Sequence, residues 1–198
     1  MEKPADTAFS VHELIRRRWS PVGFDARTVS TQTLLTLLEA ARWAPSSFND
    51  QPWAFLVATK ENEAEFRRML DCLTPGNQLW AQHAGALLIS LARLHFAHNG
   101  QPNRHAMHDV GLATENLALQ AVALGLQAHA MAGIDVEKIR SSYHVPEGWE
   151  PVAAIAVGYP SAELAHLPEK LQQRQMRSRS RRALSEFVFT GRFGESLR

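Results

Sequence analysis

The chain has 198 residues, of which 45% are hydrophobic and 21% are charged, and 21 Lys and Arg against 20 Asp and Glu give a net charge of +1. This composition is typical of a globular protein that is large enough to bury a core, and the near-neutral charge excludes an overall field for nucleic acid or an acidic membrane. Cys72 is the only cysteine, which excludes an intrachain disulfide, a four-cysteine zinc site and a CxxC redox motif, and favours a reducing, cytoplasmic setting.

The amino-terminal part of the sequence predicts two helices. Apolar residues at helical spacing between Val11 and Trp19 predict the first helix, which Pro21 ends. Ser30 is the expected N-cap of the second helix, which stops before Pro45. The residues before Val11 contain no apolar segment of the kind found in secretion signals, so we expect no export.

Short apolar runs farther along the chain predict four strands with helices between them. The strands are expected at residues 53–59, 86–91, 128–132 and 152–157, and helices at residues 61–70, 105–125 and 135–143. The helix at 105–125 carries small and aliphatic residues on nearly all sides, so it must be covered all round, as a core helix, a subunit interface or both. The uncharged run at 116–134 is interrupted by polar residues, so we expect it to be buried and not to span a membrane.

The composition changes beyond residue 160. Residues 168–182 hold six cations and one acid, which fits either a solvated tail or an arm with a binding partner. Residues 185–191 show the alternating apolar pattern of a docking strand, which indicates an arm that lies on a neighbouring subunit. We therefore divide the chain into a compact part, residues 1–160, and a carboxyl-terminal arm of the same domain, residues 161–198.

Several motifs that would identify a chemistry are absent from the sequence. It has no GxGxxG for a Rossmann site, no GxxxxGK for a P-loop and no GxSxG elbow for a serine nucleophile. Two HxxH pairs, His95 with His98 and His105 with His108, have a spacing that would place each pair on one helical face. Because nine histidines make chance pairs easy, we interpret them as surface or capping residues, with a metal-dependent helical protein as the alternative.

The stretch PSSFNDQPW is the most informative loop. Pro45 ends a helix, Ser46, Ser47 and Asn49 offer small hydrogen-bonding groups, and Trp53 starts a strand. Two interpretations are open from these residues alone. The loop is either a helix-to-strand turn held by a side-chain cap or the edge of a cofactor site.

Five segments in a fixed order resemble the nitroreductase family of FMN-dependent enzymes. They are RWSPVGFDARTVSTQTLLTLLEAARWAPSSFNDQPWAFLVATK, GNQLWAQHAGALLISLA, HDVGLATENLALQAVALGLQAHAMAGID, AAIAVGYP and RSRRALSEFVF. The resemblance covers nearly the whole chain. It implies an α+β fold with a mainly antiparallel sheet flanked by helices, in an intertwined homodimer whose carboxyl arm adds to the partner's sheet and which has two FMN sites at its interface.

The resemblance also implies where the FMN phosphate binds. Arg18 and Ser20 would hold the phosphate and ribityl groups, with the backbone of Trp19 alongside. Arg179 and Arg181 would bring further cations from the arm, so that basic segments from opposite ends of the sequence meet at one dianion.

Further residues are expected around the flavin ring. By the same resemblance, the loop residues Pro45, Ser46, Ser47 and Asn49 would border the isoalloxazine, partly from the opposite subunit. Asn77 would pair with the pyrimidine edge through its amide, which matches flavin N3 and O2. Ala132 and Gly133 would present backbone N–H groups to N5 and O4, and the missing Cβ of Gly133 would let the backbone approach the ring.

Two positions depart from the family's pattern. In the family's first motif a cation often stands where this chain has Val22, and near Asn77, where some members carry a Lys, this chain has Trp80. Both substitutions remove positive charge that would stabilise the reduced flavin. We therefore predict a lower reduction potential than in members that keep these cations. An alternative for Trp80 is that it lines the substrate cavity.

The activity implied by the resemblance needs no catalytic side chain, because the flavin carries the chemistry. Hydride from NADH or NADPH would pass through flavin N5 to a nitroaromatic, a quinone or another electron-poor acceptor in a ping-pong cycle. No nucleic-acid or membrane partner is expected. The alternative is a non-catalytic protein of the same fold that stores or senses FMN.

Overall fold

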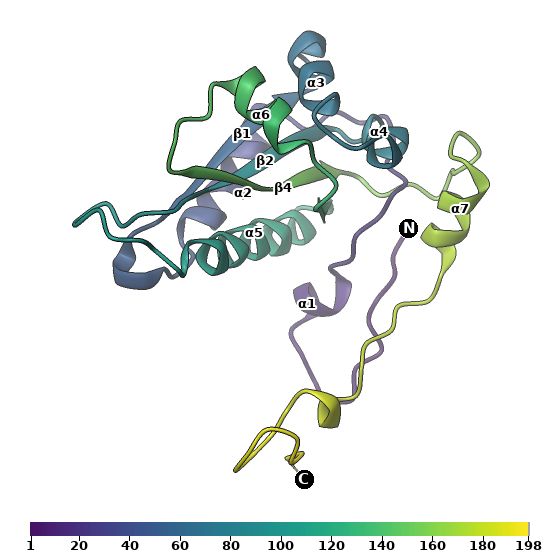
Figure 1. The fold of residues 1–198 in the computed structure, drawn as a ribbon. Helices are drawn as coiled ribbons and strands as arrows, with labels where there is room; N and C mark the ends of the chain where they lie inside the picture. Colours follow the sequence, from purple (N-terminus) through teal and green to yellow (C-terminus); the bar gives the residue numbers. More distant parts are fainter. Residues whose placement is uncertain (198) are drawn as a thin grey trace.

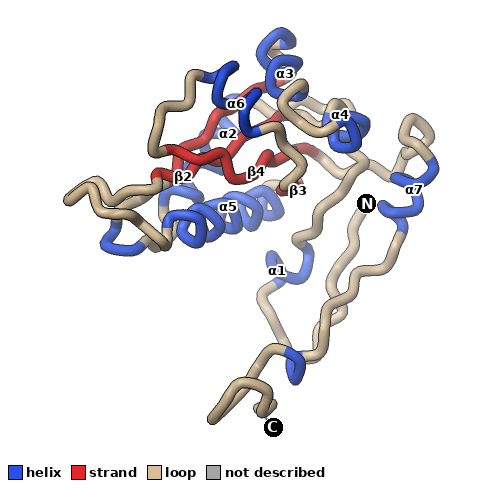
Figure 2. Tube along the Cα trace, viewed as in Figure 1, coloured by secondary structure: helices blue, strands red, loops and turns tan. Residues whose placement is uncertain are grey.

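A four-stranded antiparallel sheet forms the centre of the fold in the computed structural model, which describes residues 1–197 (Figure 1). The strands follow the order β1-β2-β4-β3 and are β1 (Trp53–Thr59), β2 (Ala86–Arg93), β3 (Gln127–Met131) and β4 (Trp149–Gly158). Helices lie on both sides of this sheet (Figure 2). The expected α+β class with an antiparallel sheet flanked by helices is confirmed.

The two central strands, β2 and β4, are covered on both faces. Leu88 of β2 pairs with Ile155 of β4, and the register shifts once, between Ser90 and Leu91. Since neither face of β2 meets water, the strand needs apolar side chains at odd and even positions alike. This explains why its sequence is a continuous apolar run.

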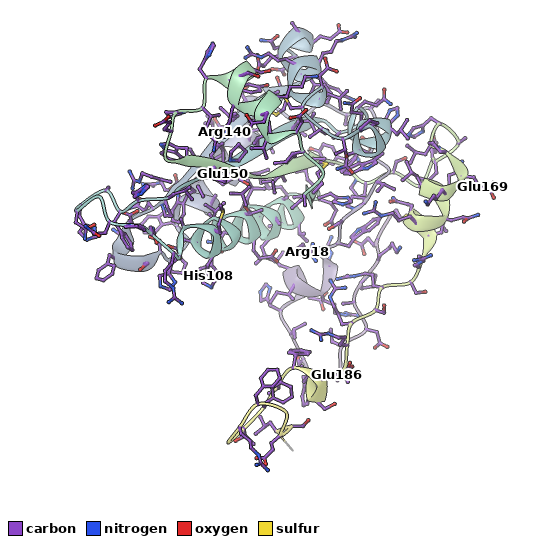
Figure 3. All side chains as sticks on the ribbon, viewed as in Figure 1. Arg18, His108, Arg140, Glu150, Glu169 and Glu186 are labelled. Carbon is purple, nitrogen blue, oxygen red and sulfur yellow. The ribbon has the colours of Figure 1, made fainter. Side chains whose placement is uncertain are left out.

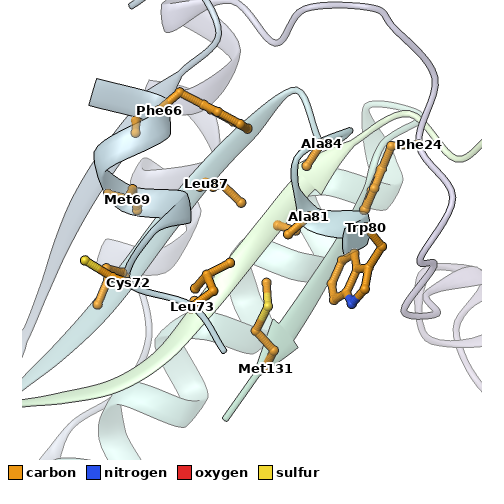
Figure 4. Packing of buried hydrophobic residues seen from close by; sticks show 14 of the residues in the cluster. Phe24, Phe66, Met69, Cys72, Leu73, Trp80, Ala81, Ala84, Leu87 and Met131 are labelled. Carbon is orange, nitrogen blue, oxygen red and sulfur yellow. The ribbon is translucent and has the colours of Figure 1, made fainter. Parts of the chain in front are cut away.

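Helices α2 (Thr31–Arg42) and α5 (Ala106–Ala123) pack on one face of the sheet, against a cluster that includes Leu88 and Ile155. Helices α3 (Glu63–Leu70), α4 (Pro75–Ala81) and α6 (Val136–Tyr143) cover the other face. In that second cluster, Met69 and Trp80 from the helix side lie over Leu87 of the sheet (Figure 4).

Short polar side chains cap α2 and α6, and the cap of α2, Ser30, is the predicted one. The Ser30 hydroxyl accepts a hydrogen bond from Thr33 N at 3.2 Å at the start of α2. Asp135 caps α6 in the same way through Lys138 N at 3.0 Å. These caps satisfy backbone donors that the first turn leaves unpaired.

Helix α5 is covered on only part of its surface within one chain. Val110 and Leu117 face the sheet side and are fully buried, whereas Met107 and Leu124 are exposed. The prediction that this helix is covered all round is therefore only partly met by the single chain.

The arm predicted for residues 161–198 packs in part on its own chain. Leu164 and Leu167 are buried in the core cluster with Trp80, and Gln175 of helix α7 (Glu169–Met176) is 1% exposed. Residues 161–176 therefore pack on their own chain, and the mostly exposed stretch starts at Arg177.

The strand predicted at residues 185–191, which was expected to dock on a neighbouring subunit, does not form within the single chain. A short 3-10 helix, η2 (Leu184–Glu186), stands there, followed by one isolated β-bridge between Phe189 and Ser196. The backbone of this stretch pairs only with nearby residues, as where Thr190 N donates to Glu195 O and Leu197 N donates to Val188 O. Figure 2 shows this end of the chain as loop on either side of the short helix.

Candidate functional site

A cavity of about 520 Å³ lies between α1 (Glu13–Arg17) and the stretch that follows α7. Four arginines line it, Arg18, Arg179, Arg181 and Arg182, although about 160 residues separate the first from the other three in the sequence. Arg18 directly follows α1, below the carboxyl end of α5 (Figure 3). The fold thus brings basic segments from the two ends of one chain to the same cavity.

The segment that carries Arg18 is bound through its backbone by a buried amide. Trp19 N donates to Gln127 Oε1 at 3.0 Å, and Gln127 Nε2 donates to Arg17 O at 3.2 Å. Gln127 opens β3 and is 7% exposed. Because both halves of its amide are used, Gln127 fixes the position of residues 17–19 beside β3, the edge strand of the sheet.

His129, two residues along β3, binds the same segment farther on. Its Nδ1 donates to Pro21 O at 2.6 Å, since a carbonyl can only accept, and its Nε2 faces Arg174 Nη2 at 3.4 Å. The ring stacks on Trp80 with 4.4 Å between centroids. Burial lowers the pKa of His129 to about 4, so the ring is neutral at pH 7 with its hydrogen on Nδ1.

Helix α7 contributes a third buried polar group. Gln175 Oε1 accepts from Val22 N at 2.8 Å and from Gly23 N at 3.3 Å. A Cβ at Gly23 would lie 2.4 Å from Leu164 Cδ2 and 3.1 Å from Gln175 Nε2, so both side chains pack closely on the glycine and would have to shift for a larger residue. The carboxyl-terminal part of the chain is thereby joined to the Arg18 segment.

The guanidinium groups are crowded by like charge. Burial, Arg18 and Arg181 together lower the pKa of Arg179. Glu115 Oε1 lies 3.5 Å from Arg18 Nε and balances part of this charge. Cations held this close repel one another, so the cavity favours an anion between them.

Ser20 and Trp19, the neighbours expected to share this role, have different surroundings. Ser20 is exposed and does not line the cavity, whereas Trp19 is 5% exposed and its Nε1 meets no acceptor among residues 1–197. The backbone of Trp19, which was expected alongside the phosphate, donates instead to Gln127.

Asn77 and Gly133 form a second group of predicted residues. Asn77 Nδ2 donates to Gly133 O at 3.0 Å, and Thr74 N donates to the same oxygen at 3.0 Å. A Cβ on Gly133 would lie 2.5 Å from Asn77 Nδ2 and 2.7 Å from Thr74 Oγ1. Glycine is therefore required here for the packing of α4 against the end of β3. Ala132, its exposed neighbour, follows β3 directly.

The PSSFN loop forms a third group, in the 3-10 helix η1 (Ser47–Asn49), which follows Pro45. Ser47 N donates to Asp109 Oδ2 at 3.0 Å, and Ser46 Oγ accepts from Gln51 N at 3.0 Å. Phe48, Asn49 and Gln51 have φ of 54°, 53° and 49°, a left-handed conformation that costs free energy for residues other than glycine. The loop is thus both held by side-chain caps and strained, and Phe48 at its tip is 81% exposed.

The three groups remain separate within one chain. Among residues 1–197, no hydrogen bond or ion pair links the arginine cavity, the Asn77 group and the PSSFN loop. That the loop reaches a flavin from the opposite subunit stays a prediction.

The two departures from the family pattern, Val22 and Trp80, are both core residues with 1% exposure. Neither lines the arginine cavity, and the alternative that Trp80 lines a substrate cavity stays a prediction. The indole Nε1 of Trp80 has no acceptor among the described residues.

Only one of the two histidine pairs lies at a helix. His95 and His98 belong to the loop between β2 and α5, and His105 caps α5 one turn before His108. No cluster of three metal-ligating side chains occurs within residues 1–197. In the same part of the chain, no helix is long and apolar enough to cross a membrane.

Gln127, His129 and Gln175 are the site residues that sequence reasoning missed. Two of them did leave a signal, because Gln127 and His129 interrupt an otherwise apolar strand and a buried polar side chain must find partners. Gln175 left none, since it is one of several polar residues in the mostly polar sequence of α7.

Comparison with known proteins gives consistent matches. The model of the Nitroreductase family matches residues 15–159. An uncharacterized 15.4 kDa protein from the ask 5' region of Mycolicibacterium smegmatis is 36% identical over 132 residues, which cover 67% of this chain and 86% of that protein. The major NAD(P)H-flavin oxidoreductase of Aliivibrio fischeri is 37% identical over 76 residues, 38% of this chain and 34% of that protein.

A solved structure described as an oxidoreductase containing FMN has a TM-score of 0.90 and 36% identity to this chain, with 96% of both chains covered. The similarity therefore includes the segments at both ends of the chain, beyond the residues that the family model matches.

Proposed function

The chain belongs to the nitroreductase family, and from that premise we propose that it is an FMN-dependent oxidoreductase that uses NADH or NADPH to reduce electron-poor acceptors. One observation carries the proposal: Arg18, Arg179 and Arg181 line a single cavity. A site of this kind suits a phosphate dianion, which arginine binds through paired hydrogen bonds.

The residues present fit FMN at its phosphate end. Mutual repulsion and burial already lower the pKa of Arg179, and a dianion would relieve that repulsion. The solved relative with the highest similarity quoted above is described as containing FMN, and the Aliivibrio fischeri relative is named for flavin and NAD(P)H. These descriptions support the same cofactor and electron donor for this chain.

When bound, the flavin would supply hydride transfer, so the protein needs no nucleophile or general acid of its own. The chain's own residues bind and orient. Gln127 and His129 hold the backbone beside Arg18, and Asn77 has an amide oxygen that accepts no hydrogen bond within residues 1–197. We propose that this amide pairs with the pyrimidine edge, with Ala132 and Gly133 beside it.

We further propose that the protein works as a homodimer with two such sites. Helix α5 is partly uncovered, and Phe9, Leu184 and Phe187 of the terminal segments are about half exposed or more, at 69%, 48% and 50%. A second copy would bury this apolar surface. It would also bring its own Pro45, Ser46, Ser47 and Asn49 to the flavin.

The visible spectrum of the purified protein, followed by anaerobic mixing with NADPH or NADH, tests both flavin binding and reduction of the flavin. A yellow protein that loses its colour within seconds supports the proposed reaction. A yellow protein that stays yellow identifies a flavin-binding protein without turnover, and a colourless one that takes up no FMN contradicts the proposal.

The order of binding has a separate test. We propose that the nicotinamide and the acceptor occupy the same place in turn, which gives a ping-pong scheme. Initial rates at several acceptor concentrations should then give parallel double-reciprocal lines. Intersecting lines would contradict a shared place.

The two core residues Val22 and Trp80 bear on the reduction potential. Neither brings a positive charge, so we propose that the bound flavin has a lower potential than in relatives with cations at both positions. Redox titration of the purified protein beside such a relative measures the difference. An equal or higher potential would contradict this part of the proposal.

A further inference from the structure

The first residues of the chain form a wall of the arginine cavity. Residues 5–9, part of what we call the amino-terminal strap (residues 3–9), line it opposite Arg179 and Arg181. The strap runs beside the stretch that follows α7 (Figure 1). Neither segment lies within residues 15–159, so this end of the cavity is built from parts that the family model does not include.

Lys3 joins the strap to α7. Its ammonium group donates to Gln175 O at 2.5 Å and also to Arg177 O, two carbonyls at the carboxyl end of the helix. A cation is favoured there because the last carbonyls of a helix are unpaired and carry partial negative charge. The same ammonium lies 5.1 Å above the ring of Trp19, next to Arg18.

The position of the Arg179 guanidinium depends on the position of the strap. Its Nη1 donates to Lys3 O at 2.7 Å and to Arg16 O at 2.8 Å. These two carbonyls, one from the strap and one from α1, hold the guanidinium near Arg18. Beyond Arg177 the chain is mostly exposed, so little other packing fixes this side chain.

We propose that Lys3 is a positioning residue for the phosphate of FMN, because it ties the strap to α7 and thereby places Arg179 beside Arg18. The proposal rests on the proposed function. Lys3 is not among the residues that line the cavity, and its ammonium is engaged by two carbonyls. It therefore acts through Arg179 and not by contact with the phosphate.

The test compares FMN with riboflavin, which lacks the phosphate, as ligands of the apoprotein. Lys3→Met keeps an unbranched side chain over Trp19 but removes the ammonium. We expect this variant to weaken FMN binding about five- to tenfold, which is most of what one charge-assisted hydrogen bond contributes to affinity. Riboflavin binding should be unchanged. Fluorescence quenching of each flavin measures both affinities.

Two further variants serve as matched controls. Lys170→Met removes the same charge from the exposed face of α7 and should bind both flavins as the wild type does. Lys3→Arg keeps a cation that reaches the same carbonyls, so it should recover most of the FMN affinity. Equal losses in Lys3→Met and Lys170→Met would mean that net charge alone matters, which overturns the proposal.

A double-mutant cycle shows whether Lys3 acts through Arg179. In the Arg179→Ala background, Lys3→Met should cost little further FMN affinity. Full additivity, or an equal loss for riboflavin and FMN, overturns the proposed role. If the wild type prefers FMN over riboflavin and Lys3→Met keeps the same preference, the role of Lys3 alone is overturned. If the wild type binds no FMN, the proposed function is overturned as well.

Discussion

The arginines of the cavity are held by two regions that are built in different ways. Arg18 belongs to a segment whose backbone is bound by buried side chains, among them Gln127 and Gln175. Arg179 and Arg181 belong to a mostly exposed stretch, and Arg179 is held there by two carbonyls. Changes in the buried region should therefore affect folding as well as binding, and changes in the exposed region should affect binding alone.

The largest effect is expected from Gln175→Leu, which removes the acceptor of Val22 N and Gly23 N. Two buried donors are then left unpaired, and we expect the free energy of unfolding to fall by about 3 to 5 kcal/mol. Urea unfolding of the apoprotein measures the loss. Gln173→Leu, on the exposed face of α7, should change it by less than about 0.5 kcal/mol. A similar stability for both variants would remove the distinction between the two regions.

A pH titration probes the same buried region through His129. Burial lowers its pKa to about 4 in the folded protein, against about 6.5 in the unfolded chain. Between these values the unfolded state binds the extra proton, so stability is present above pH 6.5 and is lost as the pH falls toward 4. The loss reaches about 3 kcal/mol, since each unit is worth about 1.4 kcal/mol.

His129→Phe separates this loss from other acid effects. The variant keeps the stack on Trp80 but loses the hydrogen bond to Pro21 O, so it is less stable at pH 7. Its unfolding free energy should change less than that of the wild type between pH 6.5 and 4. His98→Gln, at an exposed histidine, should follow the wild type. Parallel curves for wild type and His129→Phe would contradict the buried, neutral ring.

The exposed region is tested by Arg179→Ala beside Arg18→Ala. Each variant removes a charge-assisted bond worth roughly 1.5 to 3 kcal/mol, which weakens FMN binding about tenfold or more. Arg179→Ala should leave the free energy of unfolding within about 0.5 kcal/mol of the wild type, as expected for the exposed stretch. Unchanged FMN affinity in both variants would mean that the phosphate binds elsewhere.

The contrast between the regions also explains what the sequence could predict. The strand at residues 53–59 and the cap at Ser30 were predicted correctly, because each follows from a local pattern. The packing of residues 161–176 on their own chain could not be predicted, because Leu164 and Leu167 are isolated apolar residues in a polar stretch. Their burial depends on α7 folding back over the core, and no local pattern encodes that contact.

The candidate site divides in the same way. Arg18, Arg179 and Arg181 were selected by resemblance, and the fold brings them to one cavity. The sequence does not show which groups hold them, such as Lys3 O for Arg179, because every residue has a backbone carbonyl and no residue type marks the one that is used. The strand expected at residues 185–191 would need pairing from another strand, which one chain does not supply.

The smallest expected effect comes from Glu115, the counter-ion of Arg18 at the edge of the cavity. Its carboxylate lies 3.5 Å from Arg18 Nε with the side chain 53% exposed, so a phosphate must compete with it in a well-solvated place. Glu115→Gln should therefore tighten FMN binding by only about two- to threefold, and added salt should shrink the gain. Glu137→Gln on α6 is the matched control. A weaker affinity in Glu115→Gln would show that Glu115 orients Arg18 for the phosphate and does not compete with it.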